Sequence, residues 1–162
     1  MLFHFSETQN RYERLLLTNS NPVSGVAFSA YKSSSFNAAS FGKYRELVYD
    51  KTECNVGNGY STFTGTFTAS ISGTYAFTWT TCAGGDNGAI GIELVINNMV
   101  HGLLWTDSQT PADEECSTGF IIRTLNTDDV VFTRSQNTTA AHLGTIRSDE
   151  YMRTTFSGWL LF

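Results

Sequence analysis

The sequence predicts an all-β fold, a two-sheet jelly roll of about ten strands with a short N-terminal arm. After residue 25, apolar or aromatic residues alternate with Thr and other polar residues in short segments, which is typical of antiparallel strands with one buried face. Turn formers such as Asn58-Gly59 and Asn97-Asn98 separate these segments. Many short strands joined by tight turns, with no helical pattern between them, indicate a sandwich or jelly roll.

Residues 1–22 differ from the rest and predict an N-terminal arm, either a short helix or a frayed segment. Ser6 and Gln9 form a capping box, and Pro22 discourages continuation of a helix. The globular domain is therefore expected over residues 23–162. The N-terminus has neither the basic leader nor the long apolar run of a signal peptide, so either a leader has been removed or the protein stays inside the cell.

The strand segments follow one another along the remaining chain. Those with the clearest alternation are Phe63–Ala69, Tyr75–Thr80, Ile90–Ile96, Phe120–Leu125, Val130–Arg134 and Phe156–Phe162. The large side chains predicted to be buried are Phe67, Tyr75, Phe77, Phe132, Phe156 and Trp159, with Phe63 on the same face as Phe67. Longer loops are expected over residues 33–44, 83–89, 106–117 and 135–144. The glycine-rich residues 84–88 precede a strand and not a helix, so they are interpreted as a hairpin loop and not as a phosphate loop.

Length and composition limit the possible functions. A chain of 162 residues fits one domain, and 14% aromatic against 15% charged residues argue against disorder. Fifteen acidic against ten basic residues give a net charge of −5, which is not the pattern of a nucleic-acid-binding protein. The longest apolar runs are too short to span a bilayer. We therefore expect no nucleic acid partner and no membrane span.

The three cysteines leave two interpretations open. Cys54, Cys82 and Cys116 form no CxxC pair, which argues against a zinc knuckle or a redox motif. Two of them end apolar stretches, where free thiols often lie as small core groups. The sequence therefore favours inert thiols over a Cys82–Cys116 disulfide.

No arrangement of residues predicts catalysis. The three histidines lack the spacing of metal ligands, and no GxSxG motif is present. Asp107, Asp113, Glu114 and Glu115 lie in one expected loop, but their spacing alone does not support a glycosidase pair. We therefore do not expect an enzyme. The same carboxylates suit calcium, and a solvated acidic loop is the alternative.

Five motifs occur in order after residue 25. They are Val26-Ala-Phe-Ser-Ala30, Asn55-Val-Gly-Asn-Gly-Tyr60, Thr64-Gly-Thr-Phe-Thr-Ala69, Ser72-Gly-Thr-Tyr-Ala-Phe77 and Thr154-Thr-Phe-Ser-Gly-Trp-Leu-Leu-Phe162. Together they resemble the complement C1q-like globular head domain of the tumour necrosis factor-like superfamily. The resemblance implies a ten-stranded jelly roll that assembles as a homotrimer and works as a recognition module.

Within that family, Tyr75–Thr80 and residues 145–159 are similar to bivalve C1q domain-containing lectins. The resemblance implies a secreted, extracellular pattern-recognition lectin of innate immunity, whose partners are glycans or microbial polysaccharide. It also places Asp107 and Glu115 where family members hold calcium, so a calcium site and a solvated acidic loop are equal alternatives for this segment. A cytokine-like receptor-binding ligand and a calcium-binding matrix or mineral protein are the alternatives.

Candidate ligand-binding residues lie in the expected loops. They are Arg147, Asp149, Glu150 and Tyr151 before the closing strand, Asp86 and Asn87 in the glycine-rich loop, and Arg134 and His142 near the Asn137 sequon. Arg147 and Tyr151 are the preferred pair, because a guanidinium can hold a carboxylated sugar while a ring stacks on its apolar face. Ordinary loop polarity is the alternative for each residue.

Overall fold

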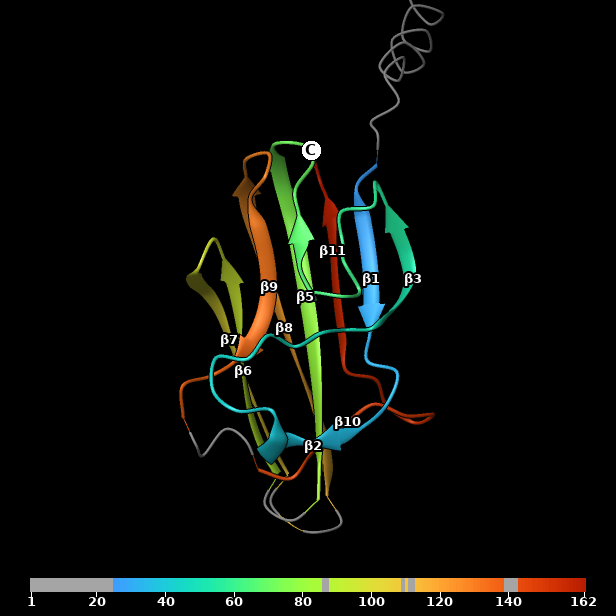
Figure 1. The fold of residues 1–162 in the computed structure, drawn as a ribbon, viewed down its shortest axis with the longest axis vertical. Coiled ribbons are helices and arrows are strands. Elements are labelled where there is room, and N and C mark those ends of the chain that lie inside the picture. Colours follow the sequence, from blue (N-terminus) through green and yellow to red (C-terminus); the bar gives the residue numbers. More distant parts are fainter. Residues whose placement is uncertain (1–24, 86–87, 109, 111–112, 139–142) are drawn as a thin grey trace, which may run out of the picture.

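Two antiparallel sheets face each other in the computed structural model, which describes residues 25–85, 88–108, 110, 113–138 and 143–162 (Figure 1). The strands in these ranges are β1 (Ala27–Tyr31), β2 (Phe36–Asn37), β3 (Lys51–Val56), β4 (Phe67–Thr68), β5 (Gly73–Gly84), β6 (Gly88–Ile96), β7 (Met99–Ser108), β8 (Glu114–Leu125), β9 (Val130–Ser135), β10 (Thr145–Arg147) and β11 (Thr155–Leu160). A short 3-10 helix, η2, covers Ala38–Ser40. The predicted all-β, two-sheet jelly roll is confirmed. The predicted arm over residues 1–22 lies outside the described residues.

The larger sheet is organised around β5. Its strand order is β2-β10-β5-β11-β1-β3, and β8 pairs with the other edge of β5. β5 is long enough to pair with β11 along residues 75–80 and with β10 along residues 82–84. The smaller sheet has the order β4-β9-β6-β7. The C-terminus and the start of β1 lie at one end of the sandwich, and β2 and β10 lie near the other (Figure 1).

Aromatic side chains fill the space between the sheets. Phe67, Tyr75, Phe77 and Phe156 are at most 1% exposed, as predicted. The Phe28 ring joins them, with its centroid 4.9 Å from that of Phe67 and 4.8 Å from that of Phe156. The alternation along β5 and β11 therefore determines which side chains form the core.

One of the six predicted core residues, Trp159, is wrongly assigned, and the strand predicted over Phe63–Ala69 begins only at Phe67. Trp159 is 38% exposed, because Phe156 faces the core and a residue three positions later on a strand faces the opposite side. Phe63 is 90% exposed, because residues 61–66 form a turn rather than the start of a strand. Hydrogen bonds close this turn from Ser61 N to Thr66 O and from Gly65 N to Ser61 O. Phe132 is 7% exposed, so the prediction that it is buried is confirmed.

The prediction of three free thiols is also wrong. Cys82 and Cys116 form a disulfide between β5 and β8, where the two residues lie directly opposite each other with their Cα atoms 4.0 Å apart. Cys54 is free and half-buried on β3. The prediction failed because 34 residues separate the paired cysteines. Only the register between β5 and β8 shows that they meet.

Two of the predicted connections differ in the structure. The glycine-rich segment joins β5 of the larger sheet to β6 of the smaller sheet, so it is a crossover and not a hairpin. β7 continues to Ser108 and β8 begins at Glu114, so the expected acidic loop is shorter than predicted. Asp107 and Glu115 consequently lie on strands. None of the helical structure in the described ranges is long and apolar enough to cross a membrane.

Candidate functional site

A polar hollow of about 380 Å³ lies where β1 ends, β3 begins and the turn before β11 meets them. Its lining residues are Tyr31, Lys32, Ser33, Lys51, Ser148, Asp149, Glu150 and Arg153. The register of the larger sheet brings these segments together, because Tyr31 pairs with Lys51 on one side and with Thr155 on the other. We refer to this set of residues as the polar hollow.

Asp50 fixes two lining residues of the polar hollow, Lys32 and Ser33, through hydrogen bonds. Its Oδ1 atom lies 3.1 Å from Lys32 Nζ and accepts the Ser33 backbone N–H at 2.9 Å. The Ser33 hydroxyl donates to the second carboxylate oxygen. Partial burial alone would raise the pKa of Asp50, but the Ser33 and Lys32 hydrogen bonds outweigh it and hold that pKa well below its usual value. Lys32 and Ser33 are therefore fixed by an ionised carboxylate.

Arg153 and Tyr31 form the aromatic part of the polar hollow. The guanidinium carbon of Arg153 lies 4.4 Å from the Tyr31 ring centroid, and its Nη1 atom lies 2.6 Å from Glu53 Oε1. Both side chains of this ion pair are more than half exposed, so the pair itself adds little stability. Its effect is to hold the guanidinium over the ring.

Two charged side chains of the polar hollow form no ion pair among the described residues. Lys51 and Glu150 are both exposed, and neither forms an ion pair with another described residue. The polar hollow therefore offers one ammonium group and one carboxylate for contacts with a ligand.

Asp149 organises the turn that carries Glu150. Its Oδ1 atom accepts the backbone N–H groups of Tyr151 at 3.0 Å and of Met152 at 3.3 Å, and its own N–H donates to Met152 O at 2.8 Å. The Tyr151 N–H and the Arg147 guanidinium lower the pKa of Asp149. The buried Ser148 hydroxyl donates to the Lys32 carbonyl, which attaches the turn to the end of β1.

The preferred pair of predicted ligand residues lies beside the polar hollow. Arg147 is bound to Glu114 at 2.6 Å and to Asp149 at 2.8 Å, so a carboxylated sugar would have to compete with two carboxylates. Tyr151 is 82% exposed and does not line the polar hollow. Asp149 and Glu150 do line it. The structure thus brings two of these four predicted residues into the hollow and leaves two next to it.

The remaining predicted ligand residues are not gathered there. Arg134 lies on β9 of the other sheet, where it contacts Glu93 at 2.8 Å and lies 4.7 Å from the Tyr44 ring centroid. Asp86, Asn87 and His142 lie outside the described residues. A further hollow of about 360 Å³ is lined by residues 57–61, 66, 68–70 and 128, none of which is Lys or Arg.

The two predicted calcium ligands, Asp107 and Glu115, lie on different strands of the described structure. Asp107 lies opposite Ala89 on β6, and Glu115 lies opposite Ala83 on β5, near the end of the sandwich where these strands are connected. No group of three or more His, Cys, Asp or Glu that could hold a metal occurs in the described ranges. Because calcium takes about six to eight oxygen ligands, these two carboxylates alone are insufficient. Calcium binding stays a prediction.

Sequence reasoning missed most of the polar hollow. Tyr31, Lys32, Lys51 and Arg153 come from three segments that are far apart in the chain, and no motif connects them. One signal was present, because the chain has only ten basic residues and three of them line this hollow. Without the strand order, that scarcity did not indicate which of them meet.

Comparisons with a protein family and with curated proteins both point to the C1q domain. Residues 27–161 match the family described as C1q domain. The mouse and human proteins named complement C1q tumor necrosis factor-related protein 3 are each 28% identical over 142 residues. These matches cover 87% of this chain and 53% of each relative, so the chain spans about half the length of these curated relatives.

Solved structures show the same fold. The globular domain of zebrafish complement 1qA has a TM-score of 0.63 at 16% identity, covering 85% of this chain and 98% of that chain. Murine APRIL has a TM-score of 0.59 at 10% identity, covering 85% and 99%. The Eiger TNF from S. frugiperda also has a TM-score of 0.59, at 11% identity, covering 85% and 93%.

Proposed function

The chain belongs to the C1q domain family, and on this premise we propose that it is a secreted, homotrimeric recognition module of innate immunity that binds glycans through the polar hollow. One observation carries the proposal. Charged side chains that form ion pairs, such as Arg153, and charged side chains that form none in the described ranges, Lys51 and Glu150, line one open hollow together with the Tyr31 ring. The proposal is for recognition and not for catalysis.

The chemistry of the polar hollow suits polyhydroxylated ligands. Sugar hydroxyls both donate and accept hydrogen bonds, and the hollow supplies a donor, the Lys51 ammonium group, and an acceptor, the Glu150 carboxylate. Lys32, Lys51 and Arg153 give three positive charges, whereas Asp149 and Glu150 give two negative charges. Asp50 and Glu53, which pair with Lys32 and Arg153, add two further negative charges and bring the net charge to −1, so a neutral glycan is a better fit than a strongly acidic one.

An apolar outer face supports the homotrimer. On the larger sheet, Val56, Trp159 and Ile122 lie in one row across β3, β11 and β8, through Ala27 and Ala76. Val56, Trp159 and Ile122 are 51%, 38% and 48% exposed, and Phe120 in the next row is 57% exposed. Such a contiguous apolar face is typical of a surface that another subunit covers. Three copies of a weak sugar site on one assembly would then bind a repetitive polysaccharide by avidity.

A glycan array tests the proposal. Neutral glycans should bind the parent protein, and Lys51→Ala should reduce that binding about tenfold or more, since the free ammonium would be lost. Lys43→Ala is the matched control, because Lys43 is also exposed but lies outside the polar hollow. Equal binding by the parent and Lys51→Ala would place the glycan site elsewhere. Repeating the array with a chelator tests whether calcium is required.

A second candidate function is that of a receptor-binding ligand. Phe63 is 90% exposed at the tip of a hydrogen-bonded turn, where an aromatic ring could enter a pocket of a protein partner. Binding to glycosidase-treated cells that is lost in Phe63→Ser would favour this function. Binding that disappears with the cell-surface glycans would favour the lectin.

A further inference from the structure

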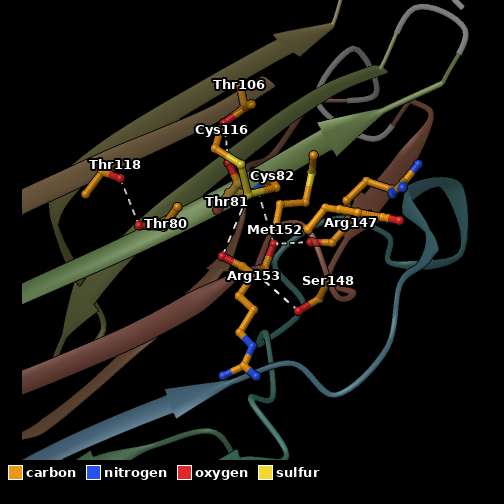
Figure 2. The surroundings of a disulfide bond; sticks show 12 residues. Thr80, Thr81, Cys82, Thr106, Cys116, Thr118, Arg147, Ser148, Met152 and Arg153 are labelled. Carbon is orange, nitrogen blue, oxygen red and sulfur yellow. Dashed lines mark hydrogen bonds between the residues drawn. A yellow bond between two sulfur atoms is a disulfide. The ribbon is translucent and has the colours of Figure 1, made fainter. Parts of the chain in front are cut away.

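The Cys82–Cys116 disulfide lies next to the turn that lines the polar hollow (Figure 2). The Cys82 backbone N–H donates to Thr154 Oγ1 at 3.1 Å, and the same hydroxyl donates to the Arg147 carbonyl at 2.7 Å. Thr154 is fully buried and directly follows Arg153. One side of the disulfide therefore contacts both ends of the segment that carries Asp149 and Glu150.

A second connection runs through side chains on the outer face of the larger sheet. Arg147, Cys82 and Cys116 occupy one row across β10, β5 and β8, and Gly84 and Glu114 lie in the row two residues further on. Residues two apart on a strand face the same side, so Arg147 and Glu114 share this face. A Cβ atom on Gly84 would lie 3.1 Å from Arg147 Cγ. Because Gly84 has none, Arg147 crosses β5 and reaches Glu114 at 2.6 Å.

Arg147 links this strand end to the turn. Its guanidinium holds Glu114 on one side and Asp149 on the other, and Asp149 accepts the N–H groups of Tyr151 and Met152. Glu114 lies only two residues from Cys116, at the start of β8. The disulfide keeps this end of β8 against β5, and so keeps Glu114 within reach of Arg147.

We propose that the Cys82–Cys116 disulfide positions the 148–153 turn for ligand binding, and that its reduction by a thiol reductant weakens binding at the polar hollow. This inference rests on the proposed function. Arg147 acts in it as a positioning residue, since it holds Asp149 and does not itself line the hollow.

The redox step is a two-electron thiol–disulfide exchange. Cys116 is exposed and Cys82 is 1% exposed, so a reductant thiolate attacks the Cys116 sulfur. The disulfide bond breaks, and Cys82 leaves as a thiolate and takes up a proton. The second thiol of a dithiol reductant then attacks the mixed disulfide. This releases the Cys116 thiol and leaves the reductant as a cyclic disulfide.

Hydrogen exchange tests, without any ligand, whether the disulfide positions the 148–153 turn. In the full chain, reduction with dithiothreitol should accelerate exchange of the Tyr151 and Met152 amides about tenfold or more, because Asp149 is then held less firmly. The amides of Phe28 and Gly158, in the β1–β11 pair, should not change. Unchanged exchange in the turn would overturn the inference. Equal acceleration in β1 and β11 would also overturn it, since reduction would then unfold the sheet.

Binding to immobilised yeast mannan, a neutral polysaccharide, tests the functional part. Reduction should weaken binding by the parent and by Cys54→Ser, the matched control that keeps the disulfide. Arg147→Ala should bind weakly already and lose little more on reduction, and Arg147→Lys should recover part of the loss. Full redox sensitivity in Arg147→Ala would overturn the role of Arg147. Failure of the oxidised parent to bind mannan would count against the proposed function, whereas the exchange result still decides this inference.

Discussion

At the scale of single residues, the clearest contrast is between Phe63, in the turn before β4, and Phe77, on β5. Phe77 is completely buried, whereas Phe63 is 90% exposed. Replacing Phe77 by Ala removes a ring that contacts Phe28, Phe67 and Phe156, so the free energy of unfolding should fall by about 3–5 kcal/mol in urea denaturation. Phe63→Ala is the control and should change it by less than about 0.5 kcal/mol. Equal effects of the two changes would contradict the observed burial.

Acid titration provides a second residue-scale prediction, centred on Asp149. Its folded-state pKa is lowered from 3.8, first by the Tyr151 N–H and then by Arg147. The stabilising contribution of this carboxylate is therefore fully present above pH 3.8 and is lost as the pH falls through the lower folded-state value. An NMR titration of the Asp149 carboxyl carbon should give a midpoint below 3.8 in the parent and a higher midpoint in Arg147→Ala. A parent midpoint at or above 3.8 would contradict the hydrogen-bonded turn.

At the scale of elements, the Trp79 ring explains how β7 and β8 close one edge of the sandwich. A Cβ atom on Gly119 of β8 would lie 2.3 Å from Trp79 Cζ2, and one on Gly102 of β7 would lie 2.5 Å from Trp79 Cη2. Both strands therefore carry glycine where they approach the indole. The ring is 1% exposed and occupies the space that two side chains would need.

Gly119→Ala should consequently destabilise the fold by about 1–3 kcal/mol, since the added methyl group overlaps a rigid ring. Thermal unfolding monitored by circular dichroism measures this loss. Gly25→Ala is the matched control, because nothing lies within 4 Å of a Cβ atom there. A variant Gly119→Ala as stable as Gly25→Ala would show that β8 lies farther from Trp79.

At the scale of the whole molecule, the apolar outer face of the larger sheet determines the expected assembly. The chain mass is 17.9 kDa, and light scattering should give about three times this value for the parent protein. Phe120→Asp adds a charge to that face without touching the core, so it should yield a folded monomer with unchanged circular dichroism. A monomeric parent, or a Phe120→Asp variant with the parent mass, would contradict the homotrimer.

The sequence was sufficient for those features that neighbouring residues determine. Alternation along residues 75–80 and 90–96 showed which side chains of β5 and β6 face the core. The turns at Asn58 and Asn97 were predicted, and these residues have the positive φ angles of 53° and 48° that Asn tolerates. The ordered motifs also indicated the family. Each of these signals is contained in a few consecutive residues, so it can be read without a three-dimensional arrangement.

The tertiary structure alone decided the register between distant strands. That register pairs Cys82 with Cys116 and brings Tyr31, Lys51 and Asp149 to one hollow. The period of a strand is a local property of the backbone, but its partner and its alignment depend on how both sheets close over one core. The sequence by itself therefore determined the strands and the family, whereas the packing of the sheets decided the disulfide and the candidate site.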